Sequence, residues 1–144
     1  MIVNYSPELF PHVLAMATAM RDEGEFKNRS INPAKFAALL ESKGVFCALC
    51  MEGNEYIGGI IACITPQFFG DDLIAQDMGL YVKPEHRGGT AAVRLAKAYE
   101  IWATTCGAKE IYLSQSTGCN IERTSALYEK MGYHIVGFLA KKET

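Results

Sequence analysis

The chain has 144 residues, of which 49% are hydrophobic and 21% are charged, and its formal net charge is −2. This length and composition predict one globular domain over residues 1–144. The near-balanced charge argues against a nucleic-acid partner, and no apolar run approaches the roughly 20 residues of a membrane helix. The first ten residues lack the basic and apolar regions of a secretory signal, so we expect a soluble, cytoplasmic protein.

The small net charge hides an asymmetry between two parts of the chain. Residues 1–82 carry five basic and ten acidic side chains, whereas residues 83–144 carry nine basic and six acidic ones. Because an anion is attracted to the basic part, we expect an anion site in the second half.

The five cysteines include one close pair, Cys47 and Cys50. Both lie in a predicted strand, where residues three apart point to opposite faces of the sheet. With no second pair and no histidine cluster, we expect neither a metal site nor a redox couple.

The first third of the chain predicts a short strand and two helices. Residues 1–4 form an edge strand, and apolar residues at helical spacing predict a helix over 7–21. A second helix begins after Asn32, a favoured N-cap, and ends near Gly44.

The middle third predicts three strands joined in sequence, over 45–51, 56–65 and 73–82. Gly53 and Asn54 favour a tight turn between the first two strands. Gly79 interrupts the third strand, and a glycine there is typical of a bulge or of close approach to the backbone.

The last third alternates between helix and strand. We expect a helix that ends at Gly107, a strand over 109–114, a helix over 121–131 and a final strand over 133–140. The element order β-α-α-β-β-β-α-β-α-β predicts an α/β fold. Its central sheet is mixed and mostly antiparallel, with a parallel pair in the second half.

The stretch YVKPEHRGGTAAVRL, residues 81–95, carries the strongest functional signal. A strand stops at Pro84, a short loop contains Gly88 and Gly89, and a helix follows at once. The unpaired amides of such a loop and of the first helical turn favour an anion, and the two glycines let a phosphate approach the main chain.

Together with the element order, this stretch resembles the GNAT superfamily of acyl-CoA-dependent N-acyltransferases. Arg87, Thr90 and Ala92 fall on the three positions of the family's phosphate-loop motif, although Thr90 stands where glycine is usual. The variant RGGTAAVRL also resembles phage-borne members. A second match, NIERTSALYEKMGYHIVGF, is similar to the family's C-terminal signature through Asn120 and Tyr128.

The resemblance implies a sheet that splays between strands 4 and 5 and binds acetyl-CoA there. It assigns cofactor binding to Leu80, Tyr81, Val82, Arg87, Gly88, Gly89, Thr90, Ala91, Ala92, Asn120 and Tyr128. Tyr128 is the candidate acid that protonates the leaving thiolate.

The general base is open at the sequence level. Gln76 occupies the position of the family's usual carboxylate, and it cannot accept a proton. Asp77 is adjacent but faces the other way on a regular strand, unless a bulge re-aims it. A water chain, or an acceptor amine that is already neutral, are the alternatives to Asp77.

The sequence therefore predicts an N-acetyltransferase that moves an acetyl group from acetyl-CoA to a small-molecule or peptide amine by direct attack. We expect a cationic acceptor to be drawn to Asp71, Asp72 and Asp77, with Phe68 and Phe69 available to line its site. Family members often pair as homodimers. The alternative is a GNAT-fold protein that binds acyl-CoA or a host partner without turnover, and a nucleotide-phosphate protein of unrelated chemistry is a third.

Overall fold

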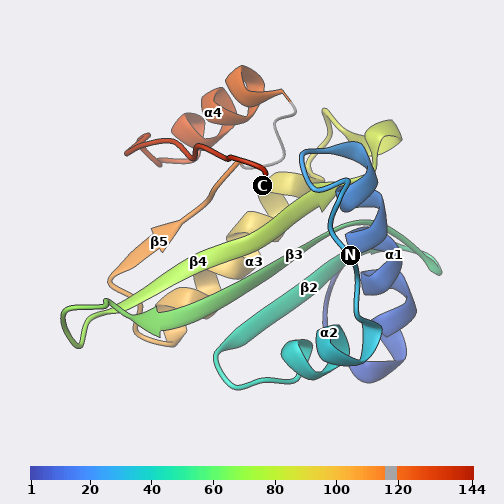
Figure 1. Cartoon of the computed structure of the whole chain (residues 1–144), viewed down its shortest axis with the longest axis horizontal. Coiled ribbons are helices and arrows are strands. Elements are labelled where there is room, and N and C mark those ends of the chain that lie inside the picture. Colours follow the sequence, from blue (N-terminus) through green and yellow to red (C-terminus); the bar gives the residue numbers. More distant parts are fainter. Residues whose placement is uncertain (116–119) are drawn as a thin grey trace.

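The computed structural model describes residues 1–115 and 120–144. Five strands form one sheet with the strands in sequence order. They are β1 (Ile2–Asn4), β2 (Val45–Glu52), β3 (Glu55–Pro66), β4 (Leu73–Val82) and β5 (Glu110–Tyr112). Figure 1 shows β2 to β5 side by side in this order.

The sheet is mixed and mostly antiparallel, which confirms the predicted α/β fold class. Strands β1 to β4 pair antiparallel with their neighbours, and β4 pairs parallel with β5. The parallel ladder is three residues long and ends where Gln76 lies opposite Tyr112. Strand β4 continues for six residues beyond this point, to Val82, so the two strands separate there, as the family resemblance implied.

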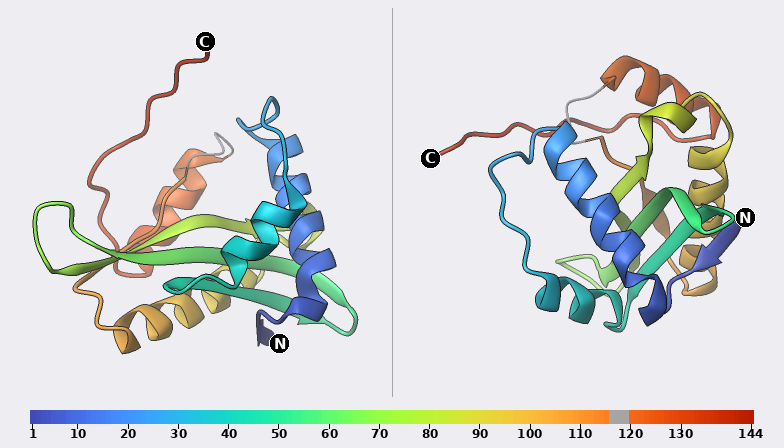
Figure 2. Two further views of the ribbon diagram at one scale, coloured as in Figure 1. Left: turned by 60° about the horizontal axis from the view of Figure 1, so that its bottom comes forward. Right: turned by 90° about the vertical axis from the view of Figure 1, so that its right-hand side faces the viewer.

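Helices cover both faces of the sheet (Figure 2). Helix α3 packs on one face, and α1 and α2 pack on the other. The helices are α1 (Phe10–Glu23), α2 (Pro33–Leu40), α3 (Ala91–Thr105) and α4 (Ile121–Lys130), with 3-10 turns η1 (Pro7–Leu9) and η2 (Pro84–His86). Within the described ranges, none of the helices is long and apolar enough to cross a membrane.

Local signals explain where the elements begin. The Asn32 side chain accepts a hydrogen bond of 3.1 Å from the Lys35 amide and caps α2, as predicted. Cys47 and Cys50 also behave as their spacing indicates, because they lie in the separate cores on the two faces of the sheet.

The prediction of a final strand over 133–140 is wrong. After α4 the chain turns at Gly132 (φ +96°) and continues without regular secondary structure to residue 144. Its apolar side chains are exposed, including Phe138 at 96% and Leu139 at 77%. A strand needs a neighbour for its backbone groups, and Lys141 instead holds the chain end against Glu25, with an ion pair of 2.9 Å.

Candidate active site

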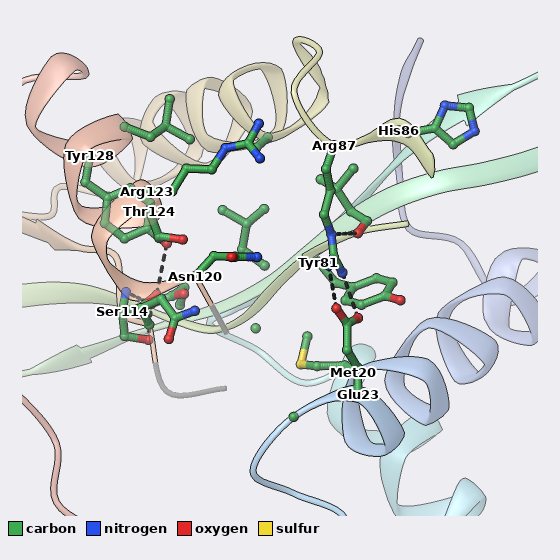
Figure 3. Close-up of a pocket in the computed structure, with 18 of the residues that line it drawn as sticks. Met20, Glu23, Tyr81, His86, Arg87, Ser114, Asn120, Arg123, Thr124 and Tyr128 are labelled. Atoms are coloured by element: carbon green, nitrogen blue, oxygen red, sulfur yellow. Dashed lines mark hydrogen bonds and ion pairs between the residues drawn. The ribbon is translucent and has the colours of Figure 1, made fainter. Parts of the chain in front are cut away.

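A cavity of about 520 Å³ opens where β4 and β5 separate (Figure 3). Its walls come from the end of α1, the second half of β4, the loop after η2, the residues after β5 and one side of α4. Past Gln76 no strand in the described part of the chain pairs with this side of β4. Backbone amides of β4 that point to this side therefore face the cavity.

A bulge in β4 directly follows Asp77. The register with β3 shifts, because Ile61 lies opposite Gly79 while Ala62 lies opposite Asp77, so Met78 is the extra residue. The extra residue changes the alternation of side chains between the two sides of the bulge. Asp77 lines the cavity, together with the residues of β4 that follow it.

Asp77 and Tyr128 are connected through Ser114, the second residue after β5. The Asp77 carboxylate accepts hydrogen bonds from the Ser114 amide (2.8 Å) and hydroxyl (3.0 Å). The Tyr128 hydroxyl donates to the Ser114 carbonyl oxygen at 2.9 Å. Residues from β4, from the loop after β5 and from α4 thus meet at one end of the cavity.

Burial changes the proton affinity of both groups. It raises the pKa of the Asp77 carboxyl from 3.8 to about 6, although the hydrogen bonds from Ser114 act in the opposite direction. Burial also raises the pKa of the Tyr128 hydroxyl, and the nearby Asp77 charge adds to this effect. At neutral pH, Asp77 is therefore able to accept a proton and Tyr128 carries one to donate.

The loop between η2 and α3, residues 87–90, forms the opposite end of the cavity. We call this segment the phosphate loop, after the motif that it carries. Gly88 has φ +91°, a conformation that side-chain-bearing residues rarely adopt, and Gly88 and Gly89 both line the wall. Helix α3 begins directly after this loop, so the amides of its first turn add partial positive charge.

Most residues assigned to cofactor binding line this cavity. Those that do are Leu80, Tyr81, Val82, Arg87, Gly88, Gly89, Ala92, Asn120 and Tyr128. Thr90 and Ala91 are not among its lining residues. Thr90 is exposed at the N-cap position of α3, and Ala91 is 4% exposed because it packs into the core on the α3 face.

The Arg87 side chain points towards α1 rather than along the phosphate loop (Figure 3). Its two terminal nitrogens donate to the two carboxylate oxygens of Glu23, one of them at 2.7 Å, and its Nε donates to the Val82 carbonyl oxygen at 2.8 Å. The Arg87 guanidinium lowers the pKa of Glu23. This bidentate pair joins the end of α1 to the phosphate loop.

Three of the polar residues that line the cavity were not predicted from the sequence: Glu23, Ser114 and Arg123. Ser114 ends the strand predicted over 109–114, and Glu23 lies beyond the helix predicted over 7–21. Arg123 lies inside the C-terminal signature itself, where a basic residue five positions before Tyr128 was a usable signal.

Two other pairs of residues that were predicted to lie near the acceptor are far from this cavity. Asp71 and Asp72 lie in the loop between β3 and β4, at the end of the sheet opposite to the phosphate loop (Figure 1). Phe68 and Phe69 are in the same loop, 92% and 76% exposed. None of the four lines the cavity, because the loop precedes β4 whereas the cavity begins at its bulge.

The described residues contain no group of three or more histidine, cysteine, aspartate or glutamate side chains that could hold a metal ion. The polar groups around the cavity are two carboxylates, hydroxyls, amides, two guanidinium groups, one imidazole and one lysine amino group. This set suits acid–base chemistry and anion binding.

Solved structures with the same fold include several acetyltransferases. AAC(6')-Iy, solved with the bisubstrate analogue CoA-S-monomethyl-acetylneamine, is 15% identical with a TM-score of 0.81, covering 100% of this chain and 97% of that one. The aminoglycoside acetyltransferase meta-AAC0020, from an uncultured soil metagenomic sample, is 16% identical with a TM-score of 0.80 and coverages of 99% and 96%.

A ribosomal-protein-alanine N-acetyltransferase from Brucella melitensis biovar Abortus 2308 is 14% identical, with a TM-score of 0.74 and 99% of each chain covered. At these identities the likeness shows the fold. A comparison with curated protein sequences gave no match. Residues 13–133, however, match the family model described as "Acetyltransferase (GNAT) family", which spans most of the chain. The chain therefore belongs to the GNAT family of acyl-CoA-dependent N-acetyltransferases.

Proposed function

We propose that this protein transfers the acetyl group of acetyl-CoA to a primary amine by direct attack of the amine. The observation that carries the proposal is the hydrogen-bonded series from Asp77 through Ser114 to Tyr128, placed where β4 and β5 separate. A proton acceptor and a proton donor are thus held at one end of a cavity whose other end suits phosphates.

The residues present fit acetyl-CoA. Residue 88 has a backbone conformation with positive φ, which favours glycine, and a side chain there would also meet the Arg123 guanidinium. Glycine therefore keeps this part of the loop open. Gly88, Gly89 and the first turn of α3 would hold the phosphates, and the exposed side of β4 would hold the pantetheine arm. Bound acetyl-CoA supplies the thioester whose acyl carbon the amine attacks.

Each side chain has a separate task in this proposal. Asp77 accepts the proton that the attacking nitrogen loses, either directly or through a water molecule, and later releases it to solvent. Tyr128 donates a proton to the departing sulfur and recovers it from solvent. The amides of β4 beyond the bulge stabilise the negative charge that develops on the acyl oxygen.

The acceptor is proposed to be a cationic small-molecule or peptide amine. Asp77 lines the cavity, and its carboxylate attracts positive charge. Similar folds named as aminoglycoside and ribosomal-protein-alanine acetyltransferases support amine acceptors of either size. Whether two copies pair as a homodimer stays a prediction.

A titration separates turnover from binding alone. Acetyl-CoA is titrated into the protein by calorimetry, and thiol release is then followed with a panel of amines that includes aminoglycosides, polyamines and lysine peptides. Amine-dependent thiol release, with a mass increase of one acetyl group on the amine, supports the proposal. Without binding of acetyl-CoA, the proposed function is wrong.

A binding protein without turnover is the second candidate, and one observation favours it. Gln76 stands where the family's usual carboxylate is expected, and it is the last residue of β4 that pairs with β5. Acetyl-CoA binding without thiol release for any amine of the panel would support this candidate. The third candidate is a nucleotide-phosphate protein of unrelated chemistry. Such a protein would bind ATP more tightly than CoA.

A further inference from the structure

We infer that Arg123, on the first turn of α4, is the side chain that binds the pyrophosphate of the cofactor. This inference rests on the proposed function and adds a binding residue that lies outside the phosphate loop. It assigns to α4 a role in holding the anion as well as in presenting Tyr128.

The position of Arg123 carries the inference. Arg123 lines the cavity, and a Cβ placed on Gly88 would lie 3.2 Å from its Nη2. In Figure 3 the side chain reaches from α4 across the cavity towards the phosphate loop. An anion on the Gly88 amide would therefore also contact the guanidinium, whose planar fork matches phosphate oxygens.

The two arginines of the cavity differ in their partners. Arg87 is bound to both carboxylate oxygens of Glu23 and to the Val82 carbonyl, so a phosphate would have to displace this bidentate pair. Arg123 forms no ion pair within residues 1–115 and 120–144, and it is exposed. Of these two arginines, the one that is available to a phosphate is thus Arg123 on α4.

The position on α4 strengthens this difference. Arg123 is the third residue of the helix, so the partial positive charge of the helix N-terminus adds to its own. The N-terminus of α3 lies on the other side of the phosphate loop. A phosphate at Gly88 would be placed between two helix N-termini and one guanidinium, a combination that favours two negative charges.

The test measures binding and does not depend on turnover. Calorimetry with CoA and with 3′-dephospho-CoA is carried out on the wild-type protein, Arg123→Gln, Arg123→Lys and Lys97→Gln. Lys97 is an exposed lysine on the second turn of α3 that does not line the cavity, so its variant makes the same change in net charge outside the site. We expect Arg123→Gln to weaken both ligands about tenfold or more, with Arg123→Lys intermediate and Lys97→Gln within about twofold.

The outcomes keep the two proposals apart. If the wild-type protein does not bind CoA, the proposed function fails and the role of Arg123 fails with it. If the wild-type protein binds CoA and Arg123→Gln binds it equally well, only the inference is overturned. An effect of Arg123→Gln on CoA that disappears with 3′-dephospho-CoA overturns the pyrophosphate assignment, because Arg123 would then contact the 3′-phosphate. Equal melting temperatures establish that the variants fold.

Discussion

The Tyr128 hydroxyl lies 2.9 Å from a carbonyl oxygen, and its pKa is raised by burial, so at neutral pH it remains a proton donor. Replacing Tyr128 by phenylalanine removes this proton and leaves the ring in place. We expect kcat to fall by about 10²-fold, the usual size of a general-acid contribution, in steady-state assays of thiol release.

Tyr133→Phe is the matched control for this variant. Tyr133 packs 6.1 Å from Tyr128 between ring centroids, and its hydroxyl bonds to Glu100 outside the cavity. The control should keep kcat within about threefold. A normal rate in Tyr128→Phe would leave Tyr128 as a packing residue and would assign the proton to solvent.

Asp77 gives a prediction for pH dependence. Because its pKa is about 6, a reaction that needs the carboxylate should show kcat/KM rising with pH through that value and then levelling. Asp77→Asn should abolish this limb and lower the plateau by about 10²-fold. Ionisation of the acceptor amine produces a separate limb, which both proteins share. If the limb near pH 6 persists in Asp77→Asn, another group is the base.

The raised pKa of Asp77 also makes the free energy of unfolding depend on pH. Between pH 3.8 and about 6 the folded protein binds more protons at Asp77 than the unfolded chain, so the free energy of unfolding falls as pH rises through this window. The asparagine oxygen can still accept from Ser114. Above pH 6 we expect Asp77→Asn to be more stable than the wild type by about 1 kcal/mol, since the carboxylate is only partly buried. Urea unfolding at pH 4 and pH 7.5 measures the difference, which should vanish at the lower pH.

At the scale of elements, the Glu23–Arg87 pair connects α1 to the phosphate loop. The two side chains are 29% and 30% exposed, so the pair is screened by solvent but keeps bidentate geometry. A double-mutant cycle with Glu23→Gln and Arg87→Gln should give a coupling of about 0.5–1 kcal/mol in the free energy of unfolding at pH 7.

This coupling depends on pH in a defined direction. The pKa of Glu23 is lowered in the folded state, so the contribution is present above the carboxyl's ordinary value of 4.5 and is lost as pH falls through the folded value. The Lys109–Asp72 pair, at 3.1 Å with side chains 69% and 63% exposed, is the control and should show a coupling close to zero. A coupling that is unchanged at pH 3 would mean that charge is not its source.

Elements also show what the sequence could and could not predict. The order of strands and helices up to α4 followed from hydrophobic periodicity and from caps such as Asn32, which are local properties. The bulge at Met78 was suggested by Gly79, yet its place directly after Asp77 depends on the register with β3, which sequence alone does not fix. The segment over 133–140 has the apolar pattern of a strand, but pairing requires a neighbour that local pattern does not reveal.

The candidate site could likewise be predicted only in part. The glycines and the helix start indicated the loop that forms one end of the cavity, since this signal depends on the backbone of adjacent residues. The partner of Arg87 lies 64 positions away on α1, and the bridge between Asp77 and Tyr128 is made by Ser114. Contacts over such separations come from packing of α1 and α4 and have no short-range signature.

At the scale of the whole molecule, the acidic first part of the chain does not act as one surface. Of its ten carboxylates, Glu23 and Asp77 line the cavity, whereas Asp71 and Asp72 lie at the far end of β4. The five residue steps from Asp72 to Asp77 span roughly 16 Å of extended chain, about two Debye lengths at physiological ionic strength. Asp72 is moreover paired with Lys109 at 3.1 Å.

Exposed carboxylates at this distance attract a cation in the cavity only weakly. The double variant Asp71→Asn/Asp72→Asn should therefore leave KM for a cationic acceptor within about twofold at 0.15 M salt. The measurement uses the best amine from the panel under saturating acetyl-CoA, with Asp77→Asn as the comparison that removes a carboxylate inside the cavity. A severalfold rise in KM for the double variant would place the acceptor's positive charge near the β3–β4 loop. Such a rise would move the proposed acceptor site from the cavity to the opposite end of the sheet.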